Sequence, residues 1–238
     1  MDVSIVSGDL GVYLQGLKNT LVLVSISFSI GLIMAVPLAV LRTSGHIVVH
    51  LLIRIFVDAC RVTPLLVQMF FLYYCFGNIE GMKETFLWPM FKEAYFCALF
   101  VFCLNTCAYT TEILTGAIVA LAQGEIEAAR AAGMSTMRLL RRIVLPVVFR
   151  RISTYSKEIV FMLHGFVLTS VITIFDITGA GRIVNSLYYS PYEALFSSAI
   201  LYLIMTLSLI VLVRTLKKRW HRPLLPLNDS ITELEAST

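Results

Sequence analysis

Long apolar runs separated by short polar segments dominate the chain. Runs of helical length lie at about residues 12–41, 51–76, 94–121, 152–175 and 194–213. About 20 mostly apolar residues in a helix are enough to cross the hydrocarbon core of a bilayer. The pattern therefore predicts an all-α polytopic membrane protein, with five transmembrane helices in one transmembrane domain at 1–222.

The distribution of basic residues predicts the direction of these helices. Fourteen of the 19 Lys and Arg residues lie in segments 42–61, 122–151 and 214–222, whereas the opposite loops, 77–93 and 176–193, hold three. Because basic residues accumulate in cytoplasmic loops, we expect the N-terminus outside the cell and the C-terminus in the cytoplasm.

Composition excludes most soluble classes. The 238 residues are 58% hydrophobic and 14% charged, with a mean hydropathy of +0.84. Charge this scarce cannot cover a water-facing surface, which excludes a secreted domain, a nucleic-acid binder and a disordered linker. Polar and acidic residues at 223–238 predict a disordered cytoplasmic tail. The five cysteines form no Cys-x-x-Cys pair and have no matching His spacing, so no metal site is expected.

The segment 122–146, between the third and fourth predicted helices, has the pattern of a docking device. Glu125 begins a strongly helix-forming stretch whose acids lie in the first turn, where the helix dipole favours them. Gly133 suits the left-handed turn that ends such a helix. An arginine-rich second helix is then expected to stop before Pro146.

This segment resembles the EAA loop of bacterial ABC-importer permeases in residue type and spacing. The matching residues are Glu127, Ala128, Ala129, Gly133, Ile143, Leu145 and Pro146. Arg61-Val-Thr-Pro-Leu-Leu-Val-Gln68 and Leu104-Asn-Thr-Cys-Ala-Tyr-Thr-Thr-Glu112 resemble the polar amino acid branch, particularly the M-subunits of histidine/lysine/arginine/ornithine and arginine permeases. Two departures are Val62, where the family has glycine, and Ala122, where many relatives have proline.

The resemblance implies a type I ABC importer permease fold in the bacterial inner membrane, transporting polar and preferably cationic amino acids. The implied ATPase-coupling residues are Glu125, Glu127, Ala128, Ala129, Gly133, Ile143, Leu145 and Pro146. The implied partners are an ABC ATPase homodimer, a second permease subunit (a heterodimer is favoured over a homodimer) and an extracytoplasmic solute-binding protein.

No cofactor is expected on this chain. The sequence contains no Gly-Lys pair and therefore no Gly-x-x-x-x-Gly-Lys-Ser/Thr phosphate loop. ATP and Mg²⁺ are accordingly expected on the partner ATPase, and the chain itself is expected to be a transport subunit with no catalytic residues.

Polar residues inside the predicted helices are candidates for a substrate pathway, because charge near the bilayer centre is costly and faces the bundle interior. Three share a face of the third helix, at spacings of four and three, and three lie on the fourth. They are Asn105, Tyr109 and Glu112, and Tyr155, Glu158 and His164.

Two other interpretations stay open at this stage. Glu112 could form an interhelical pair with Lys157 that only fixes packing, and His164 alone is more often a structural histidine. The second interpretation concerns the whole chain: an ATP-independent secondary transporter or channel would use the same acids as ion sites. The five crossings show no inverted repeat of the kind that many such carriers have.

Overall fold

The computed structural model describes residues 9–75, 78–79, 81–86, 88–119, 129, 131–135, 138, 142 and 162–220. The elements in chain order are α2 (Leu10–Arg42), α3 (Ile47–Val62), α4 (Leu65–Phe70), the π-helix η1 (Phe71–Cys75), the 3-10 helix η3 (Met82–Glu84), α5 (Trp88–Phe91), α6 (Ala94–Val119), the 3-10 helix η5 (Val167–Ile172), α11 (Ile177–Tyr188) and α12 (Pro191–Trp220). Within those ranges every regular element is helical, in agreement with the predicted all-α class.

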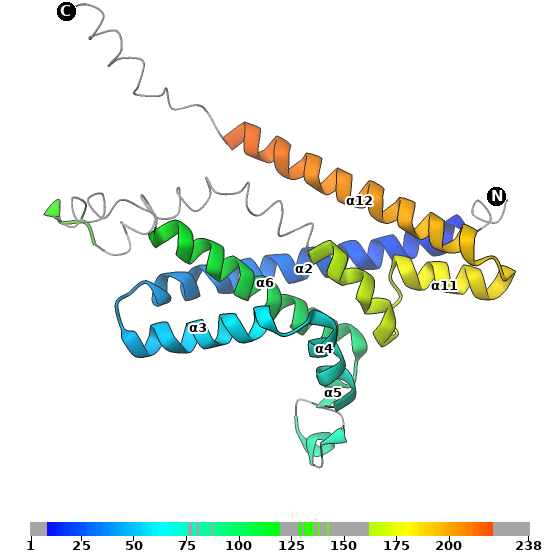
Figure 1. Cartoon of the computed structure of the whole chain (residues 1–238), viewed down its shortest axis with the longest axis horizontal. Coiled ribbons are helices and arrows are strands. Elements are labelled where there is room, and N and C mark those ends of the chain that lie inside the picture. Colours follow the sequence, from blue (N-terminus) through cyan, green and yellow to red (C-terminus); the bar gives the residue numbers. More distant parts are fainter. Residues whose placement is uncertain are drawn as a thin grey trace, which may run out of the picture.

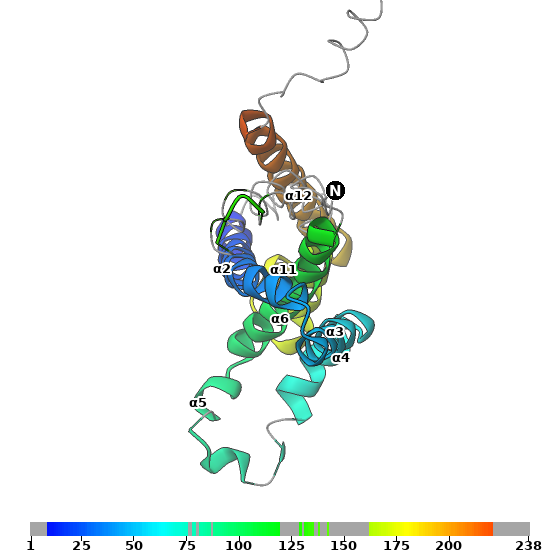
Figure 2. The same ribbon diagram turned by 90° about the vertical axis from the view of Figure 1, so that its left-hand side faces the viewer.

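Three helices are long and apolar enough to cross a membrane, namely α2, α6 and the part of α12 up to Thr215. Two bent pairs, 47–75 and 162–188, raise the number of candidate spans to five when each pair counts as one. The central pair is α2 and α6, which contact each other more extensively than any other two elements, while α11 packs against both α2 and α12. The chain from α4 to α5 projects from the side of the bundle opposite α12 (Figures 1 and 2).

One stripe of α2 faces the protein interior. Its buried members recur every three or four residues from Tyr13 to Arg42, the spacing of one helix face. Apolar residues of this stripe join a core in which the rings of Phe102 and Phe166 stack with centroids 3.7 Å apart. The rest of α2 exposes large apolar side chains such as Ile33, as expected for a surface in contact with lipid.

The close approach of α2 to α6 depends on Gly31. A Cβ atom built on Gly31 would lie 2.6 Å from the Cβ of Thr106, nearer than real Cβ contacts come. Small residues at such crossings allow helix backbones in membranes to pack closely.

We therefore expect Gly31→Ala to force α2 and α6 apart. Overpacking of this kind costs about 1–3 kcal/mol, so the apparent melting temperature of the purified protein should fall. Gly11→Ala is the matched control, because it lies in the same helix and an added Cβ there meets nothing within 4 Å. Equal melting temperatures for the two variants would contradict this account of the α2–α6 contact.

The second predicted helix, 51–76, is in fact a broken one. It begins earlier, at Ile47, and α3 ends at Val62, after which the chain turns by 99° into the segment Leu65–Cys75. The physical cause is Pro64, which has no N–H to donate and which disfavours helical backbone at Thr63, the residue before it. The side-chain amide of Gln68 donates to the carbonyls of Cys60 and Thr63, at 2.8 and 2.9 Å, and so satisfies acceptors that the break exposes.

The fourth predicted helix, 152–175, is described only from Met162 onward. There the helical segment Met162–Ile172 ends at Thr173, whose φ of 70° is left-handed, and the chain bends by 45° and continues as α11. The span thus extends beyond the predicted end. The fifth prediction, 194–213, falls within α12, which begins three residues earlier at Pro191.

Candidate functional site

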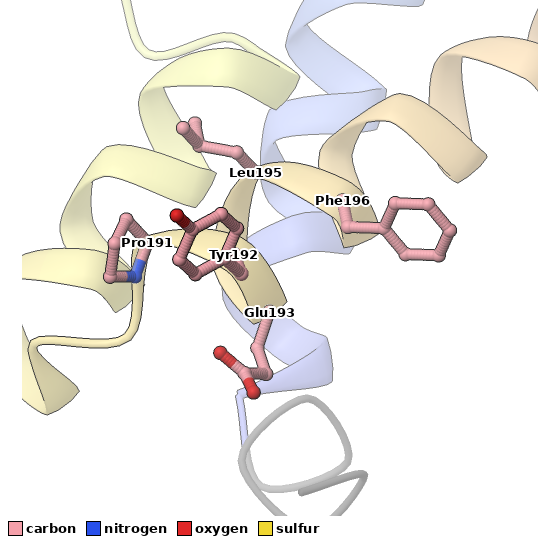
Figure 3. Close-up of a pocket in the computed structure, with 5 residues that line it drawn as sticks. All are labelled: Pro191, Tyr192, Glu193, Leu195 and Phe196. Carbon is pink, nitrogen blue, oxygen red and sulfur yellow. The ribbon is translucent and has the colours of Figure 1, made fainter. Parts of the chain in front are cut away.

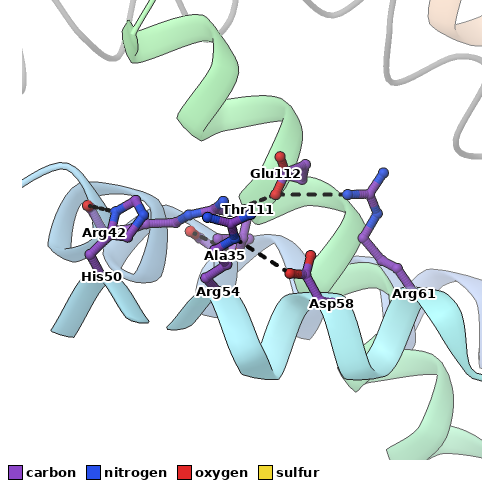
Figure 4. A network of polar contacts seen from close by, with 8 residues as sticks. All are labelled: Ala35, Arg42, His50, Arg54, Asp58, Arg61, Thr111 and Glu112. Carbon is purple, nitrogen blue, oxygen red and sulfur yellow. Dashed lines mark hydrogen bonds and ion pairs between the residues drawn. The ribbon is translucent and has the colours of Figure 1, made fainter. Parts of the chain in front are cut away.

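Three helices meet at a cluster of charged side chains around Glu112 (Figure 4). The Glu112 carboxylate of α6 accepts a hydrogen bond from Nη1 of Arg42, the last residue of α2, at 2.5 Å. Nη1 of Arg61, in the last turn of α3, lies 3.7 Å from the same oxygen. The Arg42 side chain is only 9% exposed, whereas that of Glu112 is 36% exposed, so the pair is buried on the arginine side. We call Arg42, Arg61 and Glu112 the arginine–glutamate cluster.

The Glu112 charge is compensated within the cluster, which is also locally braced. Two arginines face this one carboxylate, so the cluster as a whole carries a net positive charge. Nδ1 of His50 lies 3.1 Å from the Arg42 carbonyl oxygen, and because only an N–H can bond a carbonyl, that nitrogen carries the proton. Arg42 is thus held through both its side chain and its backbone at the point where α2 ends.

The other two predicted pathway residues of α6 also face α3. The guanidinium carbon of Arg61 lies 5.1 Å from the ring centroid of Tyr109, within cation–π range. Nδ2 of Asn105 lies 3.4 Å from the Cys60 carbonyl oxygen. The structure therefore brings Asn105, Tyr109 and Glu112 together on one face, as their spacing predicts, and directs that face at α3.

His164 lies elsewhere, in a groove of about 460 Å³ between the segment Met162–Ile172, α11 and α12. Its polar lining consists of His164, Thr178, Ser198, Tyr202 and Thr206. This groove is separate from the arginine–glutamate cluster, so the structure does not join His164 to the α6 residues. Tyr155 and Glu158 lie outside the described residues.

Of the eight predicted ATPase-coupling residues, two are described, Ala129 and Gly133. Ala129 is 6% exposed and packs in a cluster with Ala35 and Ala39 of α2 and with Leu114 and Ile118 of α6. Gly133 has a φ of 74°, the left-handed conformation expected where the first helix of the loop ends. Glu125, Glu127, Ala128, Ile143, Leu145 and Pro146 lie outside the described residues.

The structure also contains a buried polar network centred on Asp176, a residue that was not predicted as part of a site. Asp176, 1% exposed, accepts hydrogen bonds from the Gly179 amide at 2.6 Å and from the Tyr202 hydroxyl at 3.0 Å, and the Thr169 hydroxyl lies 3.1 Å away. It forms the N-cap of α11 and links that helix to η5 and α12. Its sequence signal is the helix-capping spacing Asp176-Ile-Thr-Gly179, with the side chain bonded to the amide three residues on.

A second hollow, of about 700 Å³, lies at the start of α12 and is lined by Pro191, Tyr192, Glu193, Leu195 and Phe196 (Figure 3). Its lining is mostly apolar, and Tyr192 is 86% exposed. Aromatic side chains at a helix end are typical of the membrane–water boundary. In the described part of the chain, no three His, Cys, Asp or Glu side chains are grouped so that they could hold a metal ion.

Comparison with known sequences gives extensive matches. The family described as "Binding-protein-dependent transport system inner membrane component" matches residues 27–222. The chain is 39% identical to the nopaline transport system permease protein NocM of Agrobacterium fabrum, over 94% of this chain and 93% of that protein. It is also 39% identical to the histidine/lysine/arginine/ornithine transport system permease protein HisM of Escherichia coli K12, over 91% of this chain and 92% of that protein.

The solved structures that the chain resembles are also chains of ABC transporters. A chain of an amino acid ABC transporter determined with histidines has a TM-score of 0.79 at 26% identity, covering 92% of this chain and 98% of that one. A chain of the MetNI methionine ABC transporter, in an inward-facing conformation, has a TM-score of 0.63 at 17% identity and covers 90% of this chain and 98% of its own. The second likeness is one of fold alone.

Proposed function

Because the chain belongs to the family of binding-protein-dependent transport system inner membrane components, we propose that it is the permease subunit of an ATP-driven importer of polar, cationic amino acids. The observation that carries the proposal is the match over residues 27–222 together with 39% identity to HisM. Transport proceeds by alternating access, in which ATP-driven closure of a separate ATPase dimer switches the helix bundle between outward and inward openings. The ATP-independent carrier is not favoured by this family membership.

The proposed topology has five crossings in the bacterial inner membrane, with the N-terminus outside and the C-terminal tail in the cytoplasm. The basic segments between and after the helices support it. So does the arrangement of the helices, since α2, α6 and α12 run in one direction along the bundle and α3 runs in the other (Figure 1). The arginine–glutamate cluster then lies in the cytoplasmic half of the bundle.

Coupling to the ATPase is assigned to the segment 122–146. The left-handed Gly133 provides its elbow, and Ala129 anchors it against α2 and α6. Glu125, Glu127 and Ala128 would form the helix that enters a cleft on the ATPase, with Ile143, Leu145 and Pro146 closing the second arm. The chain has no phosphate loop of its own, so ATP and Mg²⁺ bind to the partner.

The substrate class is inferred from the relatives and from Glu158, the other acid among the predicted pathway residues. HisM is named for histidine, lysine, arginine and ornithine transport. Since two arginines already neutralise Glu112, we assign substrate contact to Glu158, Tyr155 and His164, and a positioning role to the α6 residues. The proposed assembly contains a different second permease chain and an extracytoplasmic solute-binding protein.

Co-purification tests the proposal directly. The tagged chain would be extracted gently from its native membrane and its partners identified, with wild type compared to Gly133→Asp. We expect a Walker-motif ATPase with wild type and at least a fivefold loss of it with the variant, at equal permease recovery. A well-folded wild-type chain that is recovered without any ATPase would refute the importer assignment.

A further inference from the structure

Arg61 lies where the broken helix pair α3–α4 contacts α6. It lies in the last turn of α3, two residues before Thr63, where the chain begins its 99° turn toward α4. From there its guanidinium reaches α6 at Glu112 and at Tyr109, which lie three residues apart on one face. Gln68, bonded to the Cys60 and Thr63 carbonyls, ties α4 to the same end of α3.

The two arginines of the cluster hold Glu112 in different ways. Arg42 makes a hydrogen bond of 2.5 Å, and its side chain is 9% exposed. Arg61 stands at 3.7 Å, within ion-pair range but beyond hydrogen-bond distance, and is 36% exposed. Hydrogen bonds weaken steeply with displacement, whereas attraction between charges falls only as the inverse of distance. The Arg61 contact therefore tolerates movement that the Arg42 contact does not.

The apolar contacts between α3 and α6 form a small cluster. It is centred on Ile53, Val57 and Ala108, and Cys60, near the break, packs against it. Small clusters with few buried apolar contacts open and shift more readily than a large core does. Next to the break, Arg61 and the 3.4 Å contact of Asn105 with the Cys60 carbonyl join α3 to α6.

α6 also packs against the predicted coupling loop. Leu114 and Ile118, two and six residues beyond Glu112, pack in the cluster that contains Ala129. Glu112 and Tyr109 therefore lie on the helix that packs against the loop, and their contacts with Arg61 link that helix to the break between α3 and α4.

We propose that Arg61 is a positioning residue for transport, which keeps the α3–α4 break attached to α6 through Glu112 and Tyr109 while the coupling loop moves. The proposal rests on the proposed function, since it assigns Arg61 a part in transmitting ATPase motion. Arg42, by contrast, fixes the cluster in place. The property that depends on Arg61 is the number of substrate molecules imported for each ATP hydrolysed.

The test uses the complete transporter, reconstituted in proteoliposomes with its ATPase and solute-binding protein, with arginine as substrate. Arg61→Gln should lower the uptake-to-ATP ratio at least fivefold, with the KM for uptake within twofold of wild type. Arg61→Lys, which keeps the charge, should recover at least half of the wild-type ratio. The matched control is Arg54→Gln, on the same helix in an exposed i,i+4 pair with Asp58, which should leave the ratio unchanged.

A second pair of variants tests the same contact from the α6 side, in case Arg61→Gln fails to fold. Tyr109→Leu removes the ring under the guanidinium and should lower the ratio at least twofold, while Tyr109→Phe keeps a ring face and should not. A wild-type ratio in both Arg61→Gln and Tyr109→Leu would overturn the proposal, as would an equal loss in Arg54→Gln. A change in KM alone would also overturn it, since that result indicates substrate contact. Wild-type proteoliposomes without ATP-dependent uptake would refute the proposed function itself, a result visible before any variant is compared.

Discussion

Replacing Gly133 by valine should reduce substrate uptake at least fivefold in cells, while the amount of permease in the membrane stays within twofold of wild type. The reason lies in the backbone. Gly133 has a φ of 74°, and a Cβ atom added there would meet nothing within 4 Å. An added Cβ therefore meets no clash with the described residues, and the cost of a side chain there is conformational.

The magnitude follows from the left-handed conformation. A residue with a Cβ loses about 1–2 kcal/mol there, and a β-branched residue is a genuine outlier at positive φ. A free energy of that size shifts a two-state population by a factor of about 5–30. The elbow would then populate other conformations, and the segment proposed to couple to the ATPase would lose its docking geometry.

Two further variants separate this cause from others. Gly133→Asn should retain most of the uptake, because asparagine tolerates the left-handed region several-fold better than other residues. Gly45 offers a matched control, since it has a φ of 86° and equally open space but lies in the turn between α2 and α3. If Gly45→Val reduced uptake as strongly as Gly133→Val, general strain rather than the elbow would explain the loss. Uptake of radiolabelled arginine, with immunoblots of membrane fractions, provides the measurement.

The apolar runs located the helices because lipid leaves the backbone few alternatives to the helix. Their bends were harder to predict. Pro64 and the residue before it are a known signal for a helix boundary, yet hydropathy continues through them, and the prediction of one helix at 51–76 was wrong on this point. At Thr173 the sequence offers no comparable signal, because threonine seldom adopts the left-handed conformation that it has there.

Helical spacing placed Asn105, Tyr109 and Glu112 on one face, and the structure does the same. The helix that this face contacts could not be predicted from the spacing. Rotation of α6 about its axis depends on contacts with residues far away in the chain, such as Arg42, seventy positions from Glu112. The close approach of α2 and α6 at Gly31 and Thr106 contributes to setting that rotation. The pairing of Glu112 with Arg42 and Arg61 could therefore not be predicted from the helical spacing alone.

Asp176→Ala should destabilise the protein more than any exposed acid replacement. The buried carboxylate caps α11 and accepts from Gly179 and Tyr202. Loss of an N-cap costs about 0.5–2 kcal/mol, and each buried donor left unsatisfied costs about 1–3 kcal/mol. The Gly179 bond is the N-cap itself, so the cap and the Tyr202 donor together give roughly 2–5 kcal/mol. This should lower the apparent melting temperature of the detergent-purified protein by about 4–20 °C, at a conversion of about 2–4 °C per kcal/mol for a chain of this size.

Asp176→Asn distinguishes hydrogen bonding from charge in this network. Its amide oxygen can still accept from the Gly179 amide, and its amino group can donate to the hydroxyls of Thr169 and Tyr202, which rotate to accept. We therefore expect less than half the loss seen with alanine. Asp58→Ala serves as the control, because Asp58 is 53% exposed in an i,i+4 pair, and such pairs contribute about 0.3–0.5 kcal/mol. Equal losses for the alanine and asparagine variants would mean that the network requires the negative charge, and a melting temperature for Asp176→Ala like that of Asp58→Ala would mean that the network contributes little to stability.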